Sequence, residues 1–131
     1  MGKNVCCFSW SKKKINVEKL KQKLKKEIKK LVTSFDVTEF YVCAENDFDA
    51  LCTECVKEIK KEYPRVRLCL VLPAFSEKIK SEQLFDEIIH LNFEKISPQV
   101  LQLSLFDWLI DKSDFLISIT DEEHPKIKVK N

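Results

Sequence analysis

Hydrophobic positions change their spacing along this chain, and the change predicts strands and helices in turn. Residues 3–10 (KNVCCFSW) contain a short β-branched and aromatic run, which is typical of a strand buried on both faces. From Val17 to Phe35 the apolar residues recur every three or four positions, with lysines between them. This spacing predicts an amphipathic helix, and Asn16 is a suitable N-cap for it.

The same succession continues through the next part of the chain. Residues 39–44 predict a second strand, and residues 47–63 predict a second helix that Pro64 ends. Residues 65–72 (RVRLCLVL) predict a third strand, closed by Pro73. Because these strands are apolar throughout and the loops are short, the β-α-β-α-β order predicts a parallel sheet with helices packed on its faces.

The stretch from Ala74 to Ile96 is harder to interpret. Ser81 is a candidate N-cap for a further helix. The apolar residues of that helix would be Leu84, Phe85, Ile88 and Ile89. Residues 90–96 are ambiguous, and a short strand remains open for them. This region therefore predicts a third helix before the next clear signal.

A last helix is predicted from Pro98 to about Lys112, with Ser97 as its N-cap. It is apolar nearly all round, at Val100, Leu101, Leu103, Leu105, Phe106, Trp108, Leu109 and Ile110. One sheet face cannot cover all of these side chains, so we expect the helix either to be sandwiched or to form an interface. Residues 114–120 predict a further strand, and the charged tail contains a candidate short strand, IKV. We expect one α/β domain over residues 1–131, with a mostly parallel sheet of about 4–5 strands flanked by helices in three layers.

Composition changes this picture at one point in particular. The chain contains a single glycine, Gly2, although glycine averages about 7% of residues. Loops that cradle phosphate depend on glycine for positive φ and close backbone approach. Any nucleotide-binding loop here would therefore have to work without one.

Charge is distributed unevenly along the chain. Residues 1–34 hold 11 Lys and 2 Glu, a balance of +9, whereas residues 35–131 hold 12 Lys or Arg and 19 acids, a balance of −7. The lysine-rich face of the first helix is either a solvated surface or a contact for an acidic partner. Nucleic acid is the weaker interpretation because exposed aromatics, arginines and a base-reading motif are lacking there. The interface candidates on this face are Lys19, Lys23, Lys26 and Lys30.

The six cysteines are expected to be reduced and buried. No signal-peptide pattern or membrane-length apolar run is present, so we expect a cytoplasmic protein in which free cysteines pack as small hydrophobes. Cys52 and Cys55 have C-x-x-C spacing but fall on the apolar stripe of the second helix, which favours core packing over a redox or zinc site. His90 and His124 lack a partner nucleophile in any known local signature. We therefore predict no catalytic residue, no metal and no cofactor.

Several short strings resemble the SLOG superfamily, in particular its small bacterial and phage TGHR (DUF1273-like) members. The strings are CFSWSK (7–12), FYVCAENDFDAL (40–51), LCLVLPAF (68–75) and LSLFDWLIDKSDFLI (103–117). The resemblance covers about residues 3–120 and implies a Rossmann-like fold. Family members bind nucleotide-derived ligands such as ADP-ribose-like or NAD-like molecules, and their relatives include nucleoside-phosphate hydrolases.

The chain departs from the family pattern at the positions expected to bind the ligand. The Gly-His-Arg after the first strand is here Trp10, Ser11 and Lys12, and the glycine loop after the second strand is residues 43–47 (CAEND). The Arg-Asn-Arg of the late helix is Leu105, Phe106 and Asp107, and the second glycine-rich loop is residues 121–123 (DEE). The helix and strand that should close the family fold are largely missing. The chain therefore resembles a degenerate, C-terminally truncated member.

Two classes of function follow from this comparison. A retained ligand site would use Ser9, Trp10, Lys12, Glu45, Asn46, Asp49 and Thr120. Side-chain carboxylates at the start of the second helix would cap it and repel phosphate, which argues against that site. If it is lost, Leu105, Phe106 and Trp108 are interface candidates, because aromatic and leucine-rich patches form interface cores.

The primary hypothesis is therefore a non-catalytic module that acts by protein–protein interaction, with a homodimer left open. One concrete form, which rests on size and family context, is a phage or mobile-element inhibitor of a host defence enzyme, of the anti-CRISPR or anti-defence type. It would act in the bacterial or host cytoplasm. The alternative is a protein that binds or sequesters a nucleotide-derived ligand, and a remote alternative is a nucleoside-phosphate hydrolase.

Overall fold

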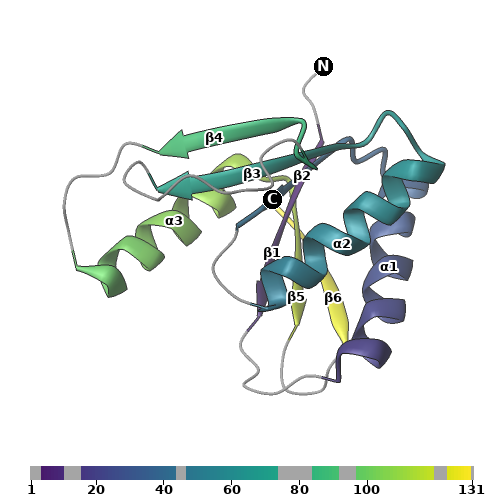
Figure 1. Ribbon diagram of the computed structural model, residues 1–131, viewed down its shortest axis with the longest axis horizontal. Helices are drawn as coiled ribbons and strands as arrows, with labels where there is room; N and C mark the ends of the chain where they lie inside the picture. Colours follow the sequence, from purple (N-terminus) through teal and green to yellow (C-terminus); the bar gives the residue numbers. More distant parts are fainter. Residues whose placement is uncertain are drawn as a thin grey trace.

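The protein is a three-layer α/β structure, as a computed structural model of the chain shows (Figure 1). The residues described are 4–10, 16–43, 47–73, 84–91, 97–119 and 124–130. Their elements are β1 (Val5–Trp10), α1 (Val17–Ser34), β2 (Glu39–Val42), α2 (Asp47–Glu62), β3 (Arg67–Pro73), β4 (Glu87–Leu91), α3 (Pro98–Lys112), β5 (Phe115–Ile119) and β6 (Pro125–Val129).

The described strands form one six-stranded sheet in the order β4-β3-β2-β1-β5-β6. All neighbours are parallel except β5 and β6, which are antiparallel. The chain moves outward from β1 through β2 and β3 to β4, and then α3 returns it to β5 on the other side of β1. The strand order therefore reverses between β1 and β5, where open α/β sheets usually place a ligand.

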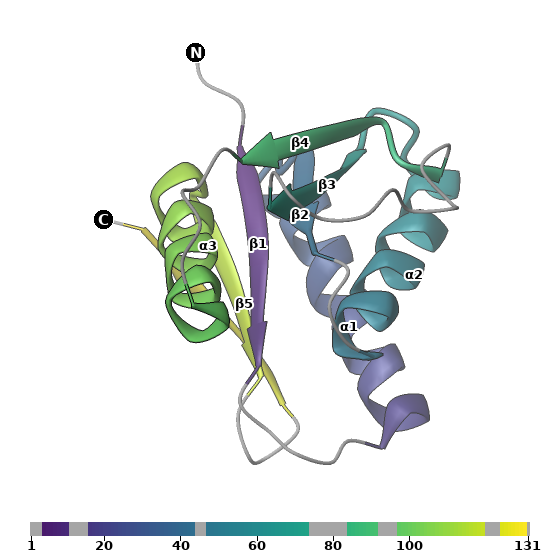
Figure 2. The same cartoon turned by 60° about the vertical axis from the view of Figure 1, so that its left-hand side comes forward.

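Helices α1 and α2 cover one face of the sheet, and α3 covers the other (Figures 1 and 2). The larger core lies under α1 and α2 and contains fully buried side chains such as Leu24, Phe40 and Leu68. A smaller cluster under α3 contains Leu105 and Leu109. Successive strand residues point to opposite faces, so each apolar strand contributes to both cores.

Most predicted elements are confirmed, and their ends follow local chemistry. Asn16 caps α1, its side chain accepting a hydrogen bond from the backbone N–H of Lys19, and Ser97 does the same for Val100 in α3. After α1, Asp36 adopts a φ of 54°, in the left-handed region where glycine is usual. In this glycine-poor chain an aspartate takes that position.

One prediction is wrong. The helix expected to contain Ile88 and Ile89 is absent, because both residues belong to strand β4, which pairs with β3. Sheet pairing with an apolar neighbouring strand outweighs the helix-like spacing of these residues. Its proposed cap, Ser81, lies outside the described residues, as do residues 92–96. With β4 and β6 both present, the described sheet has six strands rather than the expected four or five.

Candidate functional site

The joint between β1, β2 and α2 is the site that the sequence singled out, and an aromatic pair occupies its described part. The ring of Trp10 stacks on Phe48 in the first turn of α2, with centroids 5.3 Å apart and an interplanar angle of 17°. Both side chains pack against the larger core. The indole therefore lies between the carboxyl end of β1 and the start of α2, where the resemblance places a ligand.

Other residues around this joint are polar. Ser9 pairs in register with the buried Ser118 across β1 and β5. The first turn of α2 carries Asp47 and Asp49, whose carboxylates favour the positive end of the helix dipole. These acids counteract the attraction that a helix start has for phosphate. Of the other candidate ligand residues, Lys12, Glu45, Asn46 and Thr120 lie outside the described part of the chain.

The outer surface of α3 is the second region that the sequence singled out. Among its interface candidates, Leu105 is only 4% exposed and packs beneath the helix, so it is not part of the surface. Trp108 is half-buried and stacks on Tyr41 of β2, with centroids 5.7 Å apart. Both side chains attach α3 to the sheet. Phe106 is 39% exposed and does face solvent.

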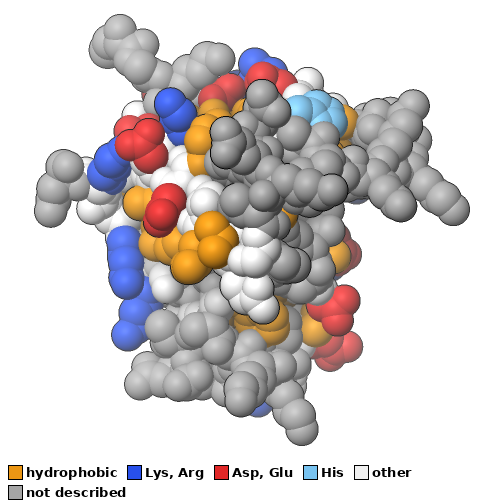
Figure 3. Space-filling view, turned by 90° about the vertical axis from the view of Figure 1, so that its left-hand side faces the viewer, with side chains coloured by type: hydrophobic (Ala, Val, Ile, Leu, Met, Phe, Trp, Pro, Cys, Tyr) orange, Lys and Arg blue, Asp and Glu red, His pale blue; other side chains and the backbone are white. Residues whose placement is uncertain are grey.

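Two further apolar side chains of α3 are more exposed than Phe106. Val100 is 48% exposed and Leu103 is 65% exposed. Residues three apart are neighbours on a helix surface, so Val100, Leu103 and Phe106 form one continuous stripe, which we call the α3 stripe. Figure 3 looks at the side of the molecule that carries α3 and shows hydrophobic side chains gathered near the middle of this face. The sequence pattern indicated surplus apolar residues here but did not show which ones are exposed.

The lysine-rich face of α1 divides into two rows. Lys21, Lys25 and Lys29 form ion pairs with Glu54, Glu58 and Glu62 of α2, at 2.8 to 3.3 Å. Lys19, Lys23, Lys26 and Lys30 lie on the other side of the helix and form no ion pair with any described residue. The acidic row of α2 therefore neutralises part of the charge that the sequence attributes to α1.

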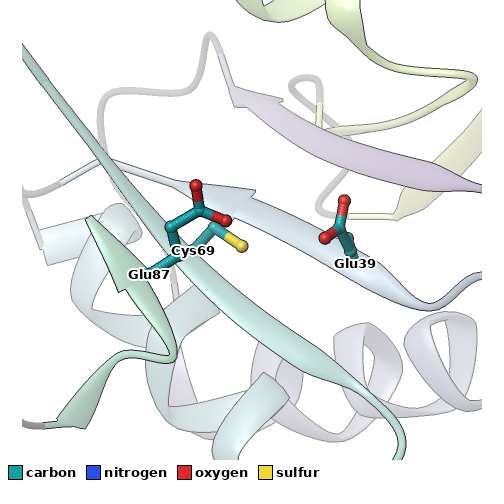
Figure 4. A group of neighbouring side chains, drawn as sticks. All are labelled: Glu39, Cys69 and Glu87. Atoms are coloured by element: carbon teal, nitrogen blue, oxygen red, sulfur yellow. The ribbon is translucent and has the colours of Figure 1, made fainter. Parts of the chain in front are cut away.

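A cluster on the α3 side of the sheet was not predicted. Glu39, Cys69 and Glu87 project from β2, β3 and β4, and the donor atoms of all three lie within 4.8 Å of one another (Figure 4). Glu39 is 4% exposed and Cys69 is fully buried, whereas Glu87 is exposed. Carboxylates and a thiolate are metal ligands, so the set could hold a divalent cation such as Zn²⁺.

The arginine in this cluster supplies the positive charge that a metal would otherwise bring. Arg67 Nη1 lies 3.7 Å from Glu39 Oε1, and Nη2 lies 3.2 Å from Glu87 Oε1. Burial, and then the charges of Glu39 and Glu87, raise the pKa of the Cys69 thiol to about 12, so the thiol is protonated at neutral pH. A cation would have to displace both Arg67 and this proton. The arrangement therefore fits a structural ion-pair network better than a metal centre.

The thiols follow the interpretation made from the sequence. All six cysteines are free, and Cys43 is the only one that is not buried. Cys52 and Cys55 face the larger core, and burial raises the pKa of both. Neither has the exposed, acidified thiol of a redox pair.

Comparisons with known proteins leave the family open: no family model and no curated protein matches the chain. The resemblance to the SLOG superfamily therefore stays a prediction. Within the described residues, no helix is both long enough and apolar enough to cross a membrane.

Proposed function

We propose that this chain is a non-catalytic α/β module that binds another protein through the α3 stripe. The observation that carries the proposal is the exposure of Val100, Leu103 and Phe106 side by side on one helix. A cluster of large apolar side chains in water is unfavourable by about 25 cal/mol per Å² that a partner could cover. Leucine and phenylalanine in the centre of a surface are suited to a desolvated contact.

Charge beside the stripe defines the partner further. The exposed Asp107 and Asp111 lie on the same side of α3 as Val100 and Leu103. In a two-fold dimer through this helix, the two sets of acids would be brought close together, which opposes self-association. A partner with an apolar groove and flanking Lys or Arg residues would complement both features. We therefore favour a different protein over a second copy.

The aromatic filling of the joint supports a protein ligand over a nucleotide. Trp10 and Phe48 occupy space that a bound nucleotide would need, and Asp47 and Asp49 add negative charge at the helix start. The chemistry of a host defence enzyme as the partner rests on the family resemblance alone and remains the most specific form of the proposal. Binding of ADP-ribose or NAD remains the alternative.

A comparison of single-residue variants tests the proposal. Leu103→Glu is expected to abolish capture of the partner from a lysate of the producing cells, while light scattering shows that the purified chain is a monomer. Val17→Glu is the matched control, because Val17 is 49% exposed and lies on α1, on the opposite face of the sheet. A monomer that captures no protein, and whose melting temperature rises with ADP-ribose or NAD, would instead support the nucleotide alternative.

A further inference from the structure

A pocket of about 150 Å³ lies away from both regions discussed so far. It is bounded by the C-terminal end of α3, the start of β5 and the end of β6, so it is at the opposite end of the sheet from the Trp10 joint. Ile110 of α3 and Leu116 of β5 supply apolar walls. A cavity of this size lined by apolar side chains accommodates a benzene-sized group.

The inner end of the pocket carries a polar group without a partner. Ser113, directly after α3, is 4% exposed, and its Oγ makes no hydrogen bond with any described residue. The neighbouring Cys7 is fully buried. Burial raises the pKa of the Cys7 thiol, and the Ser113 hydroxyl acts in the opposite direction, but sulfur is only a weak hydrogen-bond partner. Buried hydroxyls normally have a full hydrogen bond, so Ser113 is available to a ligand in the pocket.

The outer end of the pocket carries positive charge. Lys128 and Lys130 line it and are exposed, as is Asp114. Lys130 Nζ donates to the backbone oxygen of Asp111 at 2.6 Å, and Asp114 Oδ2 accepts from the backbone N–H of Val5 at 3.0 Å. Lys128 makes no ion pair or hydrogen bond with a described residue. It is the cation at this mouth that is available to an anion.

Together these features define a ligand with three parts. We propose that the pocket binds a small aromatic carboxylic acid that has a second polar group opposite its carboxylate. The ring fills the space between Ile110 and Leu116, the far polar group hydrogen-bonds to Ser113 Oγ, and the carboxylate pairs with Lys128. This site is independent of the α3 stripe, since none of the three stripe residues lines the pocket.

Three probes separate the contributions of the ring, the hydroxyl and the carboxylate. Binding of 4-hydroxybenzoate, benzoate and phenol to the full chain is measured by NMR titration, with chemical-shift changes expected at Ile110, Leu116 and Val129. We expect 4-hydroxybenzoate to bind about tenfold more tightly than either of the other two, because each lacks one polar contact of about 1 kcal/mol. The Ser113→Ala variant should bind 4-hydroxybenzoate and benzoate equally. The Lys128→Met variant should weaken both acids and leave phenol unchanged.

The variants are chosen so that loss of binding is not loss of the fold. Ser113→Ala removes a hydroxyl with no hydrogen-bond partner, and Lys128 is exposed, so both variants should keep the wild-type melting temperature. Lys126→Met is the matched control, because Lys126 lies two residues earlier on the same face of β6 and does not line the pocket. Equal affinity for all three probes overturns the proposal, as does the absence of binding at about 10 mM. Shifts confined to residues away from the pocket would also overturn it.

Discussion

The indole ring of Trp10 lies flat against the phenyl ring of Phe48, at a centroid distance of 5.3 Å. This contact joins the carboxyl end of β1 to the first turn of α2. It also places apolar surface where α/β folds usually hold a polar ligand. The stack is therefore both a packing contact and a reason to look for function elsewhere on the molecule.

The first prediction concerns this stack. Trp10→Ala should lower the free energy of unfolding by about 2–4 kcal/mol, because it removes a large, partly buried ring and leaves Phe48 unpacked. Trp10→Phe should recover more than half of that loss, since a phenyl ring still stacks. Urea unfolding followed by far-UV circular dichroism measures both. A loss below about 0.5 kcal/mol for the alanine variant would show that the stack contributes little to the fold.

The second prediction concerns the ion pairs between α1 and α2. Hydrogen bonds from Lys21 and Lys25 lower the pKa of Glu58 below its ordinary value of 4.5. A lowered carboxyl pKa means that the stabilisation is complete above the ordinary pKa and is lost as pH falls through the folded pKa. Glu58→Gln should therefore lower the melting temperature at pH 7, with a difference from wild type that disappears in acid.

Salt provides an independent check on the Glu58 variant. About 1 M NaCl should reduce the melting-temperature difference, because exposed ion pairs are screened. Glu27→Gln is the control, since Glu27 of α1 makes no ion pair with a described residue. A difference for Glu58→Gln that is the same at pH 3 and pH 7 would mean that packing, rather than charge, is responsible.

The third prediction concerns the charged cluster on the α3 side of the sheet. Arg67→Gln should destabilise the protein by about 1–3 kcal/mol, because the buried Glu39 loses a neutralising partner. Adding Glu39→Gln to that variant should restore part of the loss, whereas adding Glu87→Gln should not, since Glu87 is exposed. A double-mutant cycle in urea measures the coupling. Additive effects of Arg67→Gln and Glu39→Gln would contradict this account.

These regions also show how far the sequence carried the analysis. The periodic lysine helix and the caps at Asn16 and Ser97 are local signals, and the structure confirms them. The β4 strand was mistaken for a helix because its pairing with β3 depends on residues far apart in sequence. A short apolar run such as residues 87–91 fits either element until its neighbour is known.

The candidate sites divide in the same way. Surplus apolar residues in α3 were visible from the sequence, but only the packing separates the buried Leu105 from the exposed Leu103. The cluster around Arg67 combines three strands, and its sole local signal was a charged residue at the start of both β2 and β3. The pocket at Ser113 depends on the antiparallel β6, whose pairing no local pattern specifies.

The fourth prediction concerns the thiols. Burial keeps the pKa of Cys55 and Cys69 at about 12 and raises those of Cys6, Cys7 and Cys52, so these five remain protonated near pH 7.5. Iodoacetamide should modify the native protein at Cys43 alone, because only this thiol is partly accessible. Mass spectrometry should show one adduct, and none in Cys43→Ser. Early modification of Cys52 together with Cys55 would show instead that α2 opens readily.

The central claim is that the α3 stripe is a protein-binding surface, and site-specific photocrosslinking tests it most directly. A photoreactive phenylalanine analogue replaces Leu103 in one protein and Val17 in another, two positions of similar apolar character on opposite faces of the sheet. The account predicts one discrete crosslinked protein from position 103, no such product from position 17, and loss of the product when Phe106→Glu is added. Equal crosslinking from both positions, or none from position 103 under conditions where the intact chain has a partner, would contradict it.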